Sequence, residues 1–336
     1  MKETQKLCLT RRRFLAMGGA GVLTSACSAW GSEPPLPKRV LFIAGRSSHA
    51  FGDHRHAAGC QYLASCLNGS PNIKAEVMAD HWPVDSAVFD DVDTVVIYGD
   101  GGDGHIVRGH ANILDELIER GVGLGFLHYA LMPPTENMVP LFLNGIGGYY
   151  EPGWSVNPMW HANIKSLPKH PITRGVKPFA IQDEWYYHMR FVPGSKGVQP
   201  LLSVLPPAET LRRSDGPHSN NPDVRKEVLE LAQPQHLAWA FERADGGRGF
   251  GFSGGHYHWN WGHNDVRTLM LNAIAWLAHV NIPSAGIPSE TPTAKELLRW
   301  LGSPPADFDV SKIERMLNEW NTKTVPENSF PEPQSD

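Results

Sequence analysis

The sequence has 336 residues, of which 41% are hydrophobic and 19% charged, and this composition excludes disordered, fibrous and membrane-spanning proteins. The 30 Lys and Arg residues are outnumbered by 35 Asp and Glu, so no cationic excess exists to bind a nucleic-acid backbone, and we expect no nucleic-acid partner. Four cysteines are too few for a disulfide scaffold. The 16 histidines and 11 tryptophans are unusually many, so we look for the functional site among these two residue types.

The first 29 residues resemble a twin-arginine export signal. Arg11–Arg13 precede a weakly apolar run at 16–23, which is shorter than the ~20 residues that a membrane-spanning helix needs. We expect cleavage after this segment to leave a periplasmic protein, with residues 30–37 as a linker and no transmembrane span. Cleavage before Cys27 would leave a lipid anchor on that cysteine instead.

Buried apolar runs alternate with helical patterns from residue 38 onward. Apolar runs that end at glycine are typical of strands covered on both faces of a parallel sheet. We expect such strands at 40–44, 75–78, 94–98, 123–127, 237–241 and 249–253, and helices at 57–67, 113–119 and 265–279. This alternation predicts an α/β fold with a doubly wound, mostly parallel sheet.

Two regions depart from this alternation. Residues 145–235 are rich in aromatic residues, Pro and Gly, with short strands expected at 162–164 and 179–181, and we interpret them as an insertion that elaborates the sheet. After a domain at 38–284, the segment 285–336 carries short amphipathic stretches at 294–301 and 310–320 and is predicted to be a docking tail.

Histidines follow three of the predicted strands, at the sheet edge where α/β proteins bind ligands. His49 and His54 follow the first strand, His128 follows 123–127, and His256 and His258 follow 249–253. Imidazole serves there as a metal ligand or as a general acid or base. Since no cysteine lies nearby, the group suits a divalent metal, zinc above all. We expect His49, His128 and His256 to form the ligand core, with His54 or His258 completing it.

The glycine-rich segment Gly99–Gly104 is not a phosphate-binding loop. No Lys-Ser/Thr pair follows it, and its two aspartates would repel phosphate. We expect a flexible loop there.

A second constellation lies in the insertion. Adjacent residues of an extended segment point to opposite sides, so at most one of Asp183 and Glu184 faces a given pocket, where it would move a proton. His188 and Arg190 would orient that carboxylate. A structural alternative makes Trp185 a core residue and pairs Glu184 with Arg190. Aromatic faces beside charged groups also hold sugar rings, for which the expected lining is Tyr129, Trp154, Trp185, Tyr186 and Trp259.

From about Lys38 to Pro283 the chain resembles the ThuA-like family, named for trehalose utilisation, whose fold is related to the class I glutamine amidotransferases. The matching stretches are Ala44–His49, Gly121–Tyr129, His170–Gly175, Asp183–Tyr186, Gly247–Gly249 and Gly255–His256. The resemblance implies an amidotransferase-like fold and a carbohydrate-related role. Glutamine amidotransferases carry a nucleophilic cysteine after the central strand, where this chain has His128, so amide hydrolysis by that route is excluded.

These observations lead to an expected function with one main alternative. We expect an exported, metal-assisted lyase, hydrolase or isomerase acting on a sugar derivative such as a 3-keto-glycoside. The alternative is a non-catalytic sugar-binding or accessory protein that partners a sugar oxidoreductase through its tail. A flavin or nicotinamide oxidoreductase is disfavoured, because Ala44–His49 has one glycine where the dinucleotide motif needs three.

Overall fold

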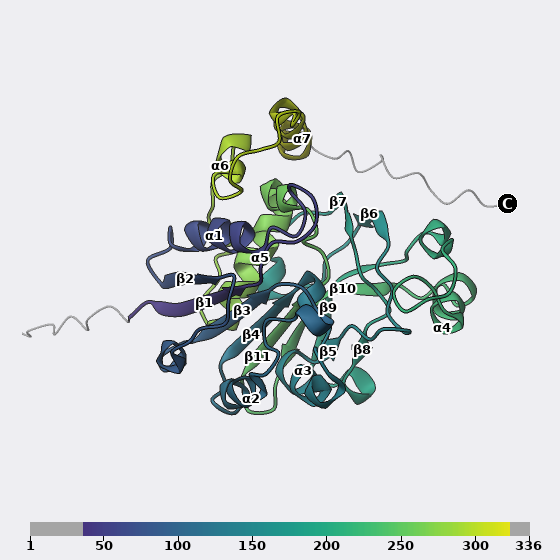
Figure 1. The fold of residues 1–336 in the computed structure, drawn as a ribbon, viewed down its shortest axis with the longest axis horizontal. Helices are drawn as coiled ribbons and strands as arrows, with labels where there is room; N and C mark the ends of the chain where they lie inside the picture. The colour runs from purple at the N-terminus through teal and green to yellow at the C-terminus, as the bar shows by residue number, and fades with distance from the viewer. Residues whose placement is uncertain (1–35, 323–336) are drawn as a thin grey trace, which may run out of the picture. The chain divides into compact units, whose positions relative to one another are not determined.

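A computed structural model describes residues 36–322, which are built around a seven-stranded sheet (Figure 1). The strands lie in the order β2-β1-β3-β4-β11-β10-β9; the first five are parallel to one another, and β10 is antiparallel to both of its neighbours, β11 and β9. Their bounds are β1 Lys38–Ala44, β2 Ile73–Ala79, β3 Thr94–Tyr98, β4 Gly123–Leu127, β9 Val198–Val204, β10 Gln235–Glu242 and β11 Arg248–Phe252. The predicted α/β class with a mostly parallel sheet is confirmed.

Helices cover both faces of this sheet (Figure 1). On β1, Phe42 packs into the core beneath α1 and α5, whereas Leu41 and Ile43 pack into the core beneath α2 and α3. The helices are α1 His56–Leu67, α2 Ala111–Glu119, α3 Val139–Ile146 and α5 Asn264–Leu277. Burial of both faces is the reason why these strands appear in the sequence as continuous apolar runs.

The predicted insertion at 145–235 contains one strand of the central sheet, which the sequence pattern did not predict. β9 pairs with β10 as an edge strand, and Pro200 lies opposite Trp239. Proline cannot donate a ladder hydrogen bond, and an edge strand tolerates this loss. The rest of the region forms the small sheets β5 (Gly148–Tyr149) with β8 (Arg190–Phe191) and β6 (Met159–Ile164) with β7 (Phe179–Glu184), and the short helix α4 (Pro222–Arg225).

The described part of the predicted docking tail packs against the chain's own domain. It holds α6 (Ala294–Leu298) and α7 (Val310–Thr322), whose buried side chains Leu297, Ile313 and Leu317 belong to the core beneath α1 and α5. Asn321 joins α7 to the start of α5, since it accepts from the Asn264 backbone N–H at 2.9 Å and donates to the Gly262 carbonyl at 3.0 Å. The tail therefore completes the domain from which it extends.

The predicted export signal, most of the linker and Cys27 lie outside the described residues. Among residues 36–322 no helix is long and apolar enough to cross a bilayer. Cys60 and Cys66 are free thiols.

Truncation of Leu317 tests how firmly α7 is held. Leu317 is 5% exposed, and we expect Leu317→Ala to lower the free energy of unfolding by about 2–5 kcal/mol because it removes buried methyl groups and leaves a cavity. Urea denaturation measures this loss, and limited proteolysis between α6 and α7 reports release of the helix. Glu314→Ala, on the exposed side of α7, is the matched control. Equal stability of the two variants would contradict the packing.

Candidate metal centre

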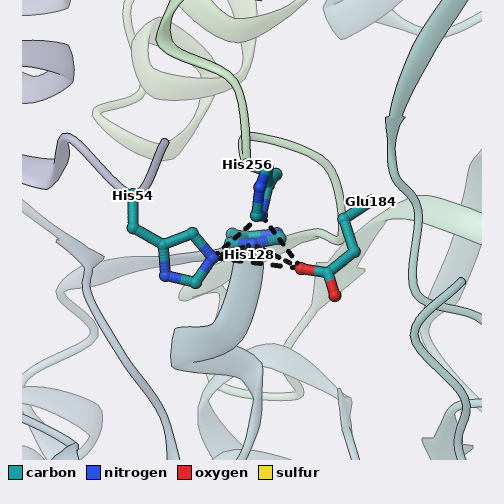
Figure 2. Close-up of side chains that lie close together, drawn as sticks. All are labelled: His54, His128, Glu184 and His256. Carbon is teal, nitrogen blue, oxygen red and sulfur yellow. Dashed lines mark hydrogen bonds and ion pairs between the residues drawn. The ribbon is translucent and has the colours of Figure 1, made fainter. Parts of the chain in front are cut away.

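Four side chains from distant parts of the chain converge at the carboxyl edge of the parallel strands (Figure 2). His54 lies between β1 and α1, His128 directly follows β4, and His256 follows β11. Glu184 is the last residue of β7 and approaches from the insertion. Parallel strands bring their carboxyl ends to one edge, and β7 closes that edge from outside the sheet.

The inward atoms of these residues lie within 4.8 Å of one another. His54 Nε2 is 3.0 Å from His128 Nε2 and 3.0 Å from His256 Nδ1. Glu184 Oε2 is 3.1 Å from His256 Nδ1, 3.4 Å from His128 Nε2 and 3.9 Å from His54 Nε2. Three ring nitrogens and one carboxylate oxygen therefore surround a single point.

Each imidazole has an oxygen atom facing its outer nitrogen. These oxygens are Asp100 Oδ1 at 2.8 Å from His54 Nδ1, the Ser253 carbonyl at 2.9 Å from His128 Nδ1, and Asp53 Oδ2 at 3.8 Å from His256 Nε2. Carboxylate and carbonyl oxygens only accept, so the single proton of a neutral His54 or His128 ring resides on the outer nitrogen and the lone pair points inward. These two hydrogen bonds orient the His54 and His128 rings as ligands, whereas Asp53 lies beyond hydrogen-bond distance of His256.

The charge balance of the centre favours a cation. Burial opposes ionisation of Glu184, but the close approach of His128, His256 and His54 outweighs it and holds the pKa of Glu184 well below the ordinary value. Burial also opposes protonation of His256, yet its contacts with Asp53 and Glu184 raise its pKa to about 9. Burial lowers the pKa of His128. A fixed carboxylate among buried imidazoles attracts positive charge, which protons or a metal ion can supply.

Two further groups hold Glu184. The Asn157 amide donates to Glu184 Oε1 at 3.0 Å, and the Tyr186 hydroxyl donates to Oε2 at 3.1 Å. The same hydroxyl lies 3.0 Å from His128 Nε2, although the Tyr186 ring itself is buried. Tyr186 is therefore the aromatic residue, among those predicted to line the site, that reaches the centre with a polar atom.

The backbone at the centre is locally strained. His49, His54 and His128 adopt φ values of 67°, 45° and 59°, in the left-handed backbone region that residues other than glycine rarely occupy. Such residues cluster at functional sites, where the surrounding structure holds them in place. At His128 the strain sits at the turn directly after β4 and directs the ring toward the other ligands.

The expected ligands His49 and His258 lie outside the group of four. His49 is exposed and forms a second potential cluster with His54 and Asp100. His258 donates from Nε2 to the Leu297 carbonyl at 2.8 Å and so faces α6. A 3-10 turn begins at His258, and the ring of this residue reaches α6 and not the ligands around His256. Of the two residues proposed to complete the set, the structure brings in His54.

The predicted acid–base residues occupy different surroundings. Asp183 accepts from the backbone N–H groups of Gly255 and His256 and from the Asn260 amide, so it positions the loop after β11. Glu184 points the other way, into the centre, as alternation along an extended segment requires.

His188 and Arg190, expected to orient the carboxylate, lie apart from the centre. Both flank Trp154: the His188 ring stacks on it at 4.1 Å, and Arg190 lies 3.5 Å above it. Arg190 forms its ion pair with Glu151, at 2.5 Å, and not with Glu184.

The remaining aromatic residues of the expected lining fall into three settings. Trp185 is fully buried and donates to the Ile181 carbonyl, as the core interpretation requires. Tyr129 is half-buried, with its ring 6.0 Å from that of Tyr186. Trp259 is 8% exposed and lines a cavity beside the centre.

Asp100, Asp53 and Asn157 were not predicted as site residues. Asp100 belongs to the segment expected to be a flexible loop, yet it accepts from both His54 and Ser48. It lies two residues after β3, the strand between β1 and β4, so its place at the carboxyl edge was available as a signal. The positions of Asp53 and Asn157 in the sequence do not indicate a place at the centre. Their approach to it depends on how the loop after β1 and the insertion fold.

Comparisons with known proteins agree with this architecture. The family model named ThuA, described as trehalose utilisation, matches residues 39–277. A putative ThuA-like protein of known structure from Bacteroides uniformis is 16% identical, with a TM-score of 0.50 over 73% of this chain and 93% of its own. One from Parabacteroides merdae is 15% identical, with a TM-score of 0.47 over 77% and 94%. A glutamine amidotransferase from Thermotoga maritima is 7% identical, with a TM-score of 0.41 over 72% and 98%. No match is found among curated protein sequences.

Removal of the outer partner of His54 tests the ligand geometry. Zinc titrated into chelator-treated protein should bind about 10–100-fold more weakly to Asp100→Asn than to the wild type, because the amide no longer fixes the proton on His54 Nδ1. Asp103→Asn, an exposed aspartate of the same loop, is the matched control. Competition with a chromophoric chelator measures both affinities. Equal affinities would show that Asp100 does not orient a ligand.

Proposed function

The chain belongs to the ThuA (trehalose utilisation) family, and from this membership and the geometry of the centre we propose that it is a metal-dependent enzyme acting on a sugar derivative. The family relates the chain to sugar metabolism. The reaction, the metal and the 3-keto-glycoside substrate class are our proposals.

The observation that carries the proposal is the convergence of three imidazole nitrogens and a carboxylate oxygen. Ligand atoms about 2.0–2.1 Å from a tetrahedral zinc lie about 3.3 Å apart. The separations of 3.0–3.9 Å between the atoms described above bracket this value. Buried lone pairs that face one another are costly unless a cation satisfies them, so the residues present fit a metal ion.

The ligand set also narrows the choice of metal. Three imidazoles and one carboxylate suit borderline divalent ions, among which zinc remains our first expectation. Four protein ligands fill a tetrahedral shell, so a reaction requires either a five-coordinate zinc or a metal with a larger shell such as iron. A measurement of bound metals must therefore cover several elements.

A metal held here would supply Lewis acidity to a carbonyl or hydroxyl oxygen of the sugar. The remaining chemistry falls to the residues on the open side of the ligands, where His49 is exposed and Asp100 and Tyr129 are half-buried. Asp183 is fully engaged by N–H donors and Glu184 belongs to the ligand set. We therefore assign the proton transfer to His49 in place of these two carboxylates.

The contacts of His49 define its proton state. Ser48 Oγ donates to Asp100 Oδ1 at 3.1 Å, so toward His49 it accepts from Nδ1–H at 2.9 Å. The lone pair then lies on Nε2, and burial, with the nearby His54, lowers the pKa of His49, which keeps the ring neutral near pH 7. Nε2 can take the proton from the carbon next to a sugar carbonyl, whose oxygen receives the electron pair. Loss of a leaving group from the neighbouring carbon, or return of the proton elsewhere, then gives elimination or isomerisation.

We also propose that the protein is exported by the twin-arginine route. The support is the sequence pattern around Arg11–Arg13 and the apolar run after it. This route is compatible with a metal centre that is loaded before export.

The metal content of the purified protein tests the proposal directly. Plasma mass spectrometry on untagged protein should find about one divalent ion per chain, and this ion should be lost in His128→Ala and Glu184→Gln. His161→Ala, an exposed histidine on β6, should retain it. Circular dichroism confirms that each variant is folded. A wild type that neither contains nor takes up zinc, iron, manganese or nickel would refute the metal-dependent function.

Replacement of His49 tests the assignment of the base. We expect His49→Gln to keep its metal and to lower kcat on 3-keto-glycosides by about 10²–10⁴-fold, because a general base is lost. The acidic limb of the pH–kcat profile should disappear with it. His161→Gln is the matched control. Loss of metal in His49→Gln would instead make this residue a ligand, and unchanged kcat would remove it from the mechanism.

A further inference from the structure

We infer that a cavity of about 620 Å³ between α7 and the loop after β11 binds the second ring of a glycoside whose first ring occupies the metal centre. This inference rests on the proposed function and deepens it, since it makes the substrate a two-ring or larger glycoside. Its support lies in the cavity's position, its aromatic walls and its charge.

The cavity lies directly beside the metal centre. Tyr257 lines it and is the next residue after the ligand His256. Asp53 also lines it and is the residue that faces the outer nitrogen of His256. Gln182 lines it from β7, two residues before Glu184 and on the same face of that strand, which places the two about 7 Å apart. Neighbouring rings of one glycoside can therefore reach both places.

Its walls present aromatic surfaces in fixed positions. The rings of Trp259 and Phe308 stack with centroids 5.4 Å apart, and Phe51 supports Phe308 at 4.9 Å. α7 contributes Met316 and Trp320, four residues apart on one face, whereas Leu317 of the same helix is buried in the core. Leu317 thus anchors α7 in the core, and the half-buried side chains of Met316 and Trp320 form the outer wall of the cavity.

The charge of the lining selects a neutral, hydroxyl-rich ligand. Asp309 is paired with Arg315 at 3.1 Å, which leaves Asp53 and Asp307 against the cation Lys312, so the lining keeps a negative balance that disfavours phosphates and other anions. A wholly apolar occupant would desolvate these carboxylates without hydrogen bonds in return. A sugar ring offers an apolar face to the aromatic walls and hydroxyl donors to the carboxylates.

A blocking substitution on α7 tests the assignment. Calorimetry on metal-loaded protein should show that at least one of trehalose, maltose and cellobiose binds about tenfold or more tightly than glucose. Met316→Trp fills the cavity from its half-exposed wall and should abolish this advantage. Asn318→Trp places the same side chain on the exposed opposite side of α7 and should preserve it. Circular dichroism and metal content, equal in all three proteins, exclude misfolding and damage to the centre.

Several results would overturn the inference. These are equal affinities for one-ring and two-ring sugars in the wild type, and a two-ring advantage that survives in Met316→Trp. Sugar binding that appears only after the chain is shortened to end at Thr322 would assign the cavity to the chain's own last residues instead. Failure of the proposed function gives a different result. The protein would then lack metal or turnover, but the wild type would still bind two-ring sugars more tightly than glucose and Met316→Trp would still lose this preference.

Discussion

The mutual approach of three imidazole nitrogens at a buried point is the constraint on which this architecture depends. His54 Nε2 lies 3.0 Å from both His128 Nε2 and His256 Nδ1, a crowding of polar atoms that a low-dielectric interior does not favour without a proton or a cation between them. Glu184 adds a negative charge, held ionised by the same rings. Only positive charge at their centre relieves this arrangement. The surrounding fold must therefore hold the four groups in place at a free-energy cost that a bound cation would offset.

Contacts at the outer nitrogens of the three rings, together with those of Asp183, hold the four groups in place. The oxygens that face the outer nitrogens of the three rings come from separate segments: Asp100 after β3, the Ser253 carbonyl after β11, and Asp53 from the loop after β1. Asp183 accepts three N–H donors of the loop that carries His256, while its neighbour Glu184 enters the centre. One strand, β7, thus both positions a ligand loop and supplies a ligand. Ligands fixed in this way lose little conformational entropy on binding.

Sequence patterns predicted the edge of the sheet where the centre lies, but not its exact membership. The strands were predictable because burial of both faces leaves uninterrupted apolar runs, and parallel strands bring the residues after their carboxyl ends to one edge. The choice of His54 over His49 depends on two left-handed backbone angles, 45° and 67°, which composition does not encode. The exclusion of His258 depends on a single 3-10 turn. The packing of α7 depends on contacts with residues more than fifty positions away, such as Gly262 and Asn264.

Asp53 links the two halves of the proposed substrate site. Its carboxylate faces His256 Nε2 on one side and lines the cavity under α7 on the other. A ring that filled the cavity would displace water from this carboxylate and strengthen its interaction with the imidazole, since electrostatic interactions grow as the local dielectric falls. An Nε2–H held by Asp53 leaves Nδ1 of His256 as the ligand atom, so occupation of the cavity and retention of the metal would reinforce each other. By linkage, a cation at the centre would then favour two-ring over one-ring ligands, although the cavity itself contacts only one of the rings.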